Sequence, residues 1–462
     1  MEYATPDGFK EKYQKLLGEE AQPFLASFDQ AVEKGFRINP LKGTVKLHDH
    51  SIDQPISYSD WGYYGKVNGK TIDHQSGLVY SQEPSAMLVG EIAHPQPGQK
   101  VLDLCAAPGG KTTYLASFMA QEGLLVTNEI NRGRAKVLAE NVERFGIQNA
   151  VILNESPDRL VKKFNGYFDL IVVDAPCSGE GMFRKDPEAV EYWSLEYPEE
   201  CARRQREILK SAMQLLAPNG NLVYSTCTFA PEEDEQIIAW LLENYPDLKM
   251  EPVARTENMD AGRPEWANGN PELAKAIRLF PHHFKGEGHF IAKLSNHAEA
   301  ATPQPKGKRK KKDRASDNSL DREQQRLWQD FANHFLVNPQ SFAKDHLIVH
   351  NQRLYYQTIP VDLSGLRIVK PGLELGKFKK RRFEPSLGLL MALQKADIKK
   401  VVEITPEQWQ KYVHGEEIAT EATGKGWVAL AVDDTIVGPG KLVQSKVKNF
   451  YPKGLRINFA VK

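Results

Sequence analysis

The sequence predicts an α/β fold, a Rossmann-like, doubly wound parallel sheet, for the central part of the chain. Between residues 95 and 295, short apolar runs alternate with segments of helical spacing, which is the pattern of strand–helix–strand units. The run FDLIVVD at 168–174 is apolar almost throughout, as expected for a strand covered by helices on both faces. A Gly-Gly pair follows the first run, where such folds place a ligand-binding loop.

The expected elements follow in chain order. Strands are predicted at residues 101–105, 124–130, 150–154, 168–174, 221–227 and 288–294. Helices are predicted directly after the Gly-Gly pair, in the segment that ends near residue 145, and at 199–217 and 232–244. Pro218 and Gly220 form a stop signal for the 199–217 helix, because neither residue continues a helix without cost.

The regions on either side of the sheet have other patterns. Residues 1–90 mix helical spacing with short strand-like runs and predict a small α+β, RNA-recognition-like domain, followed by the sheet domain at 91–296. Residues 321–462 start with a helical pattern, continue with β-like runs and predict a C-terminal α/β module. Residues 297–320 predict a basic linker that contains Lys306, Lys308, Arg309, Lys310, Lys311, Lys312 and Arg314.

Composition narrows the class of protein. Sixty basic and sixty acidic residues cancel, so net charge gives no evidence for or against a nucleic-acid partner. The four cysteines form no CxxC pair, so we expect no metal, and so few thiols suit a reducing compartment. The polar N-terminus lacks the core of a signal peptide, and no run reaches the roughly 18 apolar residues of a membrane span. We expect a cytoplasmic monomer without a membrane partner.

The segment VLDLCAAPGGK at 101–111 predicts a nucleoside site. Gly109 and Gly110 let the backbone approach a ligand, and the following helix N-terminus adds hydrogen-bond donors. Glu129 ends the second strand, where an acidic residue binds ribose hydroxyls. The alternative is a plain tight turn with a surface glutamate. The loop has neither GxGxxG nor GxxxxGK[ST], which argues against a dinucleotide or a P-loop nucleotide.

Two cysteines follow predicted strands of this sheet. Cys177 comes after the fourth strand, in DAPCSG, and Cys227 ends the fifth, in YSTCT, so both are expected at the ligand edge. A thiolate that adds to carbon 6 of cytosine makes carbon 5 a nucleophile, and a carboxyl group such as Asp174 could stabilise the ring near N3. Inert burial is the usual role of a lone cysteine. The residues alone do not choose between the two.

Four segments, LDLCAAPGGKTT, NEI, VVDAPCSGEGMFRKDP and YSTCTFAPEEDE, resemble in order the Nop/Sun family of RNA 5-methylcytosine methyltransferases. The resemblance covers about residues 30–295, and GEGMFRKDP together with the tail at 449–456 is similar to the bacterial branch that modifies small-subunit rRNA. It implies S-adenosylmethionine as methyl donor. It also implies methylation of carbon 5 of a cytosine in 16S rRNA, in the decoding region and within the 30S subunit.

Site residues carried over from this resemblance are expectations. Cys227 would be the nucleophile, Cys177 would assist product release, and Asp174 would contact the target cytosine near the cofactor. The methionine part would be held by Cys105, Ala106, Ala107, Pro108, Gly109, Gly110 and Lys111, and the ribose by Glu129, with Arg134 at a basic family position. Ser156 aligns with the adenine-binding aspartate of many members and would contact the adenine without a carboxylate.

Basic residues are expected to contact RNA. Arg37 and Asn39 lie in a segment similar to the family's N-terminal motif, and Arg184 and Lys185 follow the Pro-Cys loop. A solvated surface is the alternative. The C-terminal region is similar to PUA-like RNA-binding domains and has the basic residues Lys377, Lys379, Lys380, Arg381, Arg382, Lys446, Lys448 and Lys453. Other functions considered are a tRNA cytosine-5 methyltransferase, a noncatalytic ribosome-assembly factor and a DNA cytosine methyltransferase.

Overall fold

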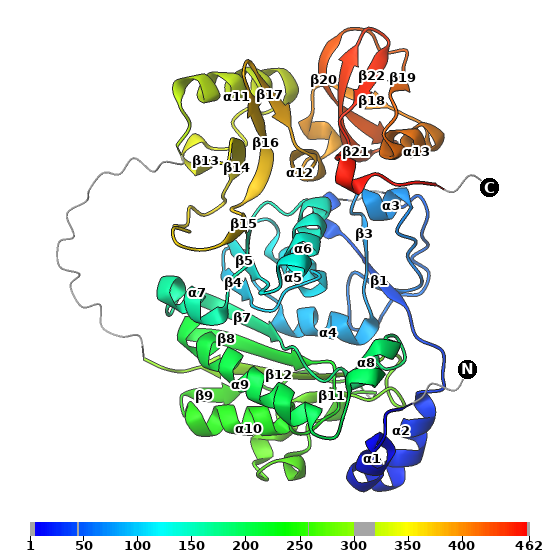
Figure 1. Ribbon diagram of the computed structural model, residues 1–462, viewed down its shortest axis with the longest axis vertical. Helices are drawn as coiled ribbons and strands as arrows, with labels where there is room; N and C mark the ends of the chain where they lie inside the picture. Colours follow the sequence, from blue (N-terminus) through cyan, green and yellow to red (C-terminus); the bar gives the residue numbers. More distant parts are fainter. Residues whose placement is uncertain (1–4, 44–45, 257, 300–318, 460–462) are drawn as a thin grey trace, which may run out of the picture.

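A ten-stranded mixed sheet lies at the centre of the molecule (Figure 1). The computed structural model describes residues 5–43, 46–256, 258–299 and 319–459, so the basic residues of the expected linker at 306–314 lie outside the described residues. The five central strands of the sheet are parallel: β8 (Leu216–Thr226), β7 (Phe168–Asp174), β4 (Lys100–Asp103), β5 (Leu124–Asn128) and β6 (Ala150–Leu153).

Antiparallel strands extend this core at both edges. β12 (His289–Asn296) pairs with β8, and the sheet continues on that side with β11 (Ile277–Leu279), β10 (Asp260–Ala261) and β9 (Leu248–Met250). On the other side, β15 (Ile368–Lys370) pairs with β6. The expectation of a parallel sheet is confirmed for the five core strands and wrong for the edge strands, which are antiparallel. An antiparallel strand can join the edge of a sheet without a crossover helix, so the strand–helix alternation does not predict its direction.

Helices cover both faces of the sheet, as a doubly wound fold requires (Figure 1). One face packs α4 (Pro84–Ala93), α5 (Gly110–Met119) and α6 (Arg132–Phe145). The other packs α7 (Pro157–Phe164), α9 (Tyr197–Leu215) and α10 (Glu235–Asn244). Strand β7 shows the reason: Leu170 and Val172 join the first core, and Ile171 and Val173 join the second, because successive strand residues point to opposite faces.

The N-terminal region packs against the loops that carry the cysteines. It contains α1 (Phe9–Leu17), α2 (Ala21–Ser27), α3 (Ile72–Gln75) and an antiparallel sheet of β2 (Gly62–Tyr64), β1 (Gly35–Ile38) and β3 (Val79–Ser81). The buried aromatic residues of the segment that contains α1 and α2 share one cluster with Phe183, Trp193 and Phe229, which lie in or beside the two cysteine loops. Helix α8 (Pro187–Tyr192) follows the first of these loops. The position of the cysteine loops therefore depends on α1 and α2.

Two further sheets form the C-terminal region, in the upper part of Figure 1. The first contains β13 (Leu347–His350), β14 (Arg353–Tyr356), β16 (Leu373–Lys379) and β17 (Arg382–Pro385), with α11 (Arg322–Phe335) beside it. The second contains β18 (Val401–Glu403), β20 (Lys425–Val432), β21 (Thr435–Val443), β22 (Lys446–Asn449) and β19 (Ile418–Ala419), with α12 (Leu387–Met391) and α13 (Pro406–His414). Among the described residues, no helix is long and apolar enough to cross a membrane.

Candidate active site

The loop between β4 and α5 lies at the edge of the sheet where the parallel strands end. Gly109 precedes α5 with a φ of 114°, a left-handed conformation that favours glycine, and a Cβ there would come 3.1 Å from Leu138. Arg134 Nη2 donates to the carbonyl of Ala107 at 2.6 Å, and the Asn141 amide donates to the carbonyl of Pro108 at 2.7 Å. Helix α6 thus fixes the loop, and the predicted cofactor residue Arg134 supports its backbone.

Asp103 presents a free acceptor beneath this loop. The Thr112 hydroxyl donates to its Oδ2 at 2.6 Å, whereas Oδ1 is buried and has no partner in the described parts of the chain. Burial, opposed in part by the Thr112 hydrogen bond, raises the pKa of Asp103 to about 7. An ammonium group would satisfy Oδ1 and favour the carboxylate. A ligand with an amino-acid part therefore fits this loop.

Glu129 is buried where β5 ends, at the position predicted for a ribose contact. Its Oε1 accepts from the backbone N–H of Asn131 at 2.8 Å, and its Oε2 lies 3.6 Å from Arg134 Nη1. The carboxylate keeps acceptor capacity for hydroxyl groups. Asp103, Gly109 and Glu129 together fit S-adenosylmethionine, which carries an ammonium, a carboxylate and a ribose.

The loop after β6 is held by the C-terminal region. Glu155 is fully buried, and its carboxylate accepts from the backbone N–H of Arg367 at 2.7 Å and from the guanidinium of Arg367 at 3.1 Å. Ser156 is half-buried and directly precedes α7. The adenine contact of Ser156 stays a prediction. No local pattern pointed to Arg367, because it lies more than 200 residues further along the chain.

A lysine–aspartate pair lies next to the cysteines. Lys111 Nζ donates to Asp174 Oδ2 at 2.7 Å, and the Ser225 hydroxyl donates to Oδ1 at 2.9 Å. Burial opposes charge on Asp174, but Lys111, with smaller contributions from His289 and the Ser225 hydroxyl, lowers its pKa below the usual value. Burial likewise opposes charge on Lys111, but Asp174 and then Cys227 raise its pKa. Both groups are therefore ionised at neutral pH, with an ammonium beside Cys227.

The two cysteines come together from different loops. Cys177 Sγ lies 3.3 Å from Cys227 Sγ, and both thiols are free and half-buried. The hydrogen bond to Cys227 and then burial raise the pKa of Cys177 well above its usual value. Cys177 therefore remains a protonated thiol at neutral pH and can donate its proton toward Cys227.

Two buried carboxyl groups hold the cysteine loops together. Neither was predicted from the sequence. Glu233 accepts from the backbone N–H of Ser178 at 3.0 Å and from the Gln205 amide at 2.7 Å. Glu180 accepts from the Thr228 hydroxyl at 2.9 Å and from the backbone N–H of Phe229 at 3.1 Å. The short distance between the two sulfurs is thus supported by hydrogen bonds between the loops. Both glutamates lie within the motif segments, but only the structure reveals their burial.

Three residues expected to contact RNA are instead buried, and their expected role is corrected. The Arg37 guanidinium donates to Gln82 and to the Gly110 carbonyl, and it lies over the Tyr114 ring. Asn39 donates to the carbonyls of Gly77 and Phe145. These groups connect the N-terminal region to the sheet domain and face away from solvent, so an RNA phosphate cannot reach them.

Arg184, the third of these residues, forms a buried ion pair with Glu287. Its Nε lies 2.7 Å from Glu287, and its other nitrogens donate to the carbonyls of Ser27 and Gly286 at 3.0 and 2.8 Å. Lys185 is half-buried, and its RNA contact stays a prediction.

We expect Arg184→Ala to lower the free energy of unfolding by about 3–5 kcal/mol, because it leaves the Glu287 carboxylate buried without its partner. Thermal and urea unfolding measure this loss. Lys185→Ala, its neighbour in sequence, serves as control and should change stability by less than about 1 kcal/mol. Unchanged stability of Arg184→Ala with weakened RNA binding would restore the RNA-contact role.

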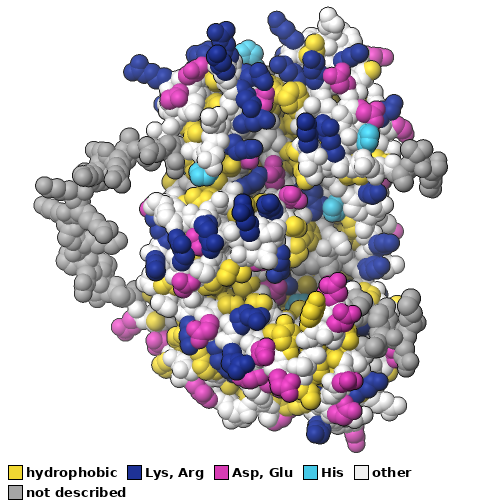
Figure 2. All heavy atoms as spheres, in the orientation of Figure 1, with side chains coloured by type: hydrophobic (Ala, Val, Ile, Leu, Met, Phe, Trp, Pro, Cys, Tyr) yellow, Lys and Arg dark blue, Asp and Glu magenta, His cyan; other side chains and the backbone are white. Residues whose placement is uncertain are grey.

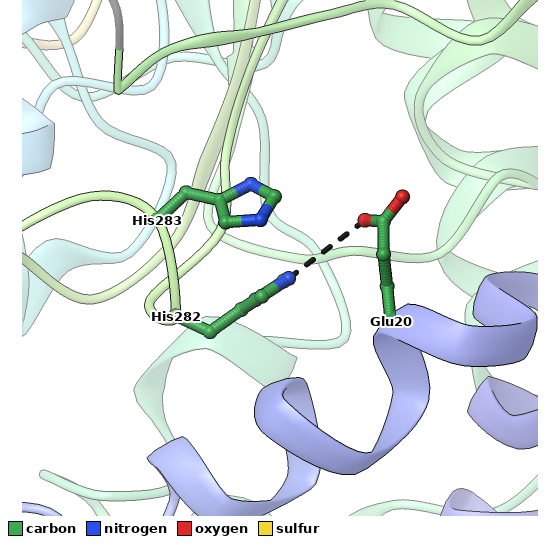
Figure 3. A group of neighbouring side chains, drawn as sticks. All are labelled: Glu20, His282 and His283. Carbon is green, nitrogen blue, oxygen red and sulfur yellow. Dashed lines mark ion pairs between the residues drawn. The ribbon is translucent and has the colours of Figure 1, made fainter.

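A second cluster of possible metal ligands lies away from this site. Side chains of Glu20, His282 and His283 place one ligand atom each within 4.8 Å of one another (Figure 3). Arg263 Nη2, however, lies 2.8 Å from Glu20, and His283 Nδ1 lies 2.9 Å from Asp260. A guanidinium already neutralises the carboxylate, and its charge would repel a metal ion. We assign no metal to this cluster, and the expected absence of a metal remains a prediction.

Basic side chains gather over the C-terminal region and the middle of the face seen in Figure 2. Lys379, Lys380 and Arg381 are exposed at the turn between β16 and β17, and the neighbouring Lys377 and Arg382 pair with Glu384. Further exposed lysines on or after β22 are Lys446, Lys448 and Lys453. This distribution is consistent with the expected RNA-binding surface.

Family models match most of the chain. The model described as 16S rRNA methyltransferase RsmB/F matches residues 91–295, and that of the N-terminal domain of 16S rRNA methyltransferase RsmF matches 5–84. The RsmF first C-terminal domain matches 330–393, and the methyltransferase RsmF PUA domain matches 399–457. The expected resemblance is thereby confirmed, and the PUA-like character of the C-terminal region is confirmed for residues 399–457, whereas residues 330–393 match a separate domain.

Individual proteins agree with these models. Ribosomal RNA small subunit methyltransferase F of Vibrio parahaemolyticus is 30% identical over 97% of both chains. A methyltransferase homologue from Pyrococcus horikoshii, solved by crystallography, is 28% identical, with a TM-score of 0.52 over 62% of this chain and 93% of that one. NSun6 from the same organism, solved with SFG, shares the fold at 22% identity and a TM-score of 0.53, over 65% of this chain and 100% of that one.

Proposed function

The chain belongs to the RsmB/F family of 16S rRNA methyltransferases, and on this basis we propose that it methylates carbon 5 of a cytosine in 16S rRNA through a covalent adduct on Cys227. S-adenosylmethionine-dependent rRNA methylation is the activity of the family as a whole. The position of the cytosine in the decoding region, the 30S subunit as substrate and action in the cytoplasm are parts of the proposal.

One observation carries it: two free thiols 3.3 Å apart, beside an ionised lysine–aspartate pair. A thiolate is the nucleophilic form of a cysteine, and the Lys111 ammonium supplies positive charge on this side of the site. Addition of the Cys227 thiolate to carbon 6 forms a C–S bond and shifts the C5–C6 π pair into the C4–C5 bond, while the C4–N3 π pair moves onto N3, which takes up a proton or hydrogen bond. Carbon 5 then becomes the nucleophile of the reaction.

The ionisation of Asp174 indicates which hydrogen bond it would make with cytosine. Because its pKa is lowered, Asp174 is a carboxylate and accepts hydrogen bonds, so it suits the exocyclic amino group of cytosine. The proton or hydrogen bond that the ring needs would come from Lys111, the donor held beside it. In this proposal, Asp174 accepts from the amino group, and Lys111 supplies the proton or hydrogen bond that was first expected from Asp174.

The methyl donor would be held by residues of the β4–α5 loop and the end of β5. Asp103 Oδ1 would accept from its ammonium and Glu129 from its ribose, and the contacts of residues 105–111 stay as predicted. S-adenosylmethionine bound there supplies an electrophilic methyl group. Arg134 and Asn141, which hold the backbone of the loop, would keep it in place for this ligand.

Methyl transfer from labelled S-adenosylmethionine tests the proposed function. We expect label in 16S rRNA, as naked RNA or in 30S particles, and recovery of 5-methylcytidine after digestion to nucleosides. Transfer RNA and a matched DNA serve as competing acceptors. Label on tRNA alone or on DNA would redirect the proposal. Absence of label on every acceptor, from folded protein that binds the methyl donor, would indicate a noncatalytic factor.

Asp103→Asn should weaken binding of S-adenosylmethionine by roughly 10- to 100-fold, because the charged acceptor of its ammonium is lost. Calorimetry without RNA measures this change, and Asp330→Asn, at an exposed position of α11, is the control. Because the pKa of Asp103 is about 7, a proton competes with the ammonium below that pH. Wild-type affinity should fall by up to about tenfold per pH unit between 7 and 5. The same pH dependence in Asp103→Asn would contradict the assignment.

A further inference from the structure

His289 opens β12 directly beside the end of β8. The two strands are antiparallel, with Phe290 opposite Thr226 and Ile291 opposite Ser225. Continued by one residue beyond the paired positions, this register would place His289 opposite Cys227, and His289 lies two residues before Ile291 on the same strand. Residues opposite each other on antiparallel strands share a face of the sheet. The imidazole is therefore on the face of Ser225, whose hydroxyl binds Asp174.

The hydrogen bonds of His289 decide its tautomer. Nδ1 lies 2.8 Å from the Ser85 hydroxyl oxygen, and that hydroxyl donates its own proton to Glu83. Ser85 can therefore only accept from His289, which places the ring proton on Nδ1. Nε2 is left with a bare lone pair.

The Nε2 atom of His289 is buried and accepts no hydrogen bond from the described residues. His289 is 4% exposed, and Nε2 has no hydrogen-bond partner within the described residues. Buried polar atoms are almost always paired, so an orphan acceptor in a reaction site points to a donor on the ligand. The charged groups that act on the ring are Lys111, Glu83 and Asp174. Burial and then Lys111 lower the pKa of His289 to about 4, so the ring is neutral under assay conditions.

We propose that His289 Nε2 accepts a hydrogen bond from the exocyclic amino group of the target cytosine. The amino group has two N–H donors, and the site offers two acceptors for them, the Asp174 carboxylate and His289. Uracil presents a carbonyl oxygen at the same position, whose lone pairs would face both acceptors. His289 would thus contribute to selection of cytosine. The inference rests on the proposed function, because it assumes that a cytosine enters this site.

Two separate changes test the contact: one removes the imidazole nitrogens of His289, and the other removes the amino group of the target base. The full chain is assayed on 16S rRNA assembled by ligation, with either cytosine or 2-pyrimidinone, which lacks the amino group, at the methylated position. His289→Phe keeps the ring size without the acceptor, and His289→Gln offers an amide oxygen. Melting temperature and S-adenosylmethionine affinity show that both variants are folded.

We expect His289→Phe to lower kcat/KM on cytosine by roughly 10- to 100-fold, in line with one lost base contact, and to leave kcat/KM on 2-pyrimidinone unchanged. His289→Gln should recover part of the loss on cytosine. The ratio of wild type to His289→Phe should stay constant from pH 6 to 9. Equal losses on both bases would overturn the contact and indicate a structural role. If the wild type transfers no methyl group to cytosine, the proposed function itself fails.

Discussion

Cys227→Ala is expected to reduce methyl transfer on the order of 10⁴-fold or more, a loss typical of removing a covalent nucleophile. Without the thiolate, no bond forms at carbon 6, and carbon 5 keeps the weak nucleophilicity of free cytosine. Single-turnover transfer of labelled methyl groups to 16S rRNA measures the loss. RNA that carries 5-fluorocytosine at the methylated position gives an independent readout, because it should trap wild-type protein as a covalent adduct and leave Cys227→Ala free.

Cys201→Ala is the matched control, since this thiol is buried in α9 and does not take part in the contact between Cys177 and Cys227. It should retain both transfer and adduct formation. The assignment of the nucleophile is wrong if Cys227→Ala still transfers methyl groups at a rate within tenfold of the wild type. A folded Cys177→Ala that fails to form the adduct would shift the role to Cys177.

Cys177→Ala should stop turnover after the first methyl transfer and accumulate a covalent protein–RNA complex. Release requires a base to take the carbon 5 proton, after which the C5–C6 bond re-forms, the C–S bond breaks and Cys227 leaves as thiolate. Cys177 is a protonated thiol 3.3 Å from that sulfur and can stabilise the departing charge by a hydrogen bond. Loss of this donor slows the break, so the adduct persists in denaturing gels with unmodified RNA.

Cys177→Ser keeps a hydrogen-bond donor at the same place and should restore part of the turnover. A burst of one methyl group per protein, followed by a rate reduced by about 100-fold or more, is the expected kinetic pattern for Cys177→Ala. Normal turnover without an adduct would show that Cys177 does not assist release. Normal turnover in Cys177→Ala together with loss of transfer in Cys227→Ala would leave the nucleophile assigned and the release group unknown.

The parallel core of the sheet was predictable because its signals are local. The apolar run at β7, the Gly-Gly loop after β4 and the periodic helices each lie within a few residues, and their order fixes which strand ends share an edge. Helix α9 ends at Leu215, close to the predicted stop at Pro218. The antiparallel direction of the edge strands was not predicted, because the residues of a short strand such as β15 do not indicate which strand it pairs with.

Burial explains the errors at the predicted RNA contacts. Polar residues are usually exposed, so the sequence alone predicts a surface position for Arg37, Asn39 and Arg184, although all three are buried. Each is instead surrounded by partners far along the chain, such as Gln82, Phe145 and Glu287. The same long-range pairing hid Glu233 and His289, whose environments come from several different elements.

Three features were predictable from the amino-acid sequence alone: the methyltransferase sheet, the loop that fits the methyl donor, and two cysteines at one edge of the sheet. These follow from residue types and local order, which topology carries into space. Three other features became visible in the folded chain: the two sulfurs lie 3.3 Å apart, Lys111 pairs with Asp174, and the C-terminal region supplies β15. Those facts depend on packing between residues 50 or more positions apart, and no local pattern fixes such distances.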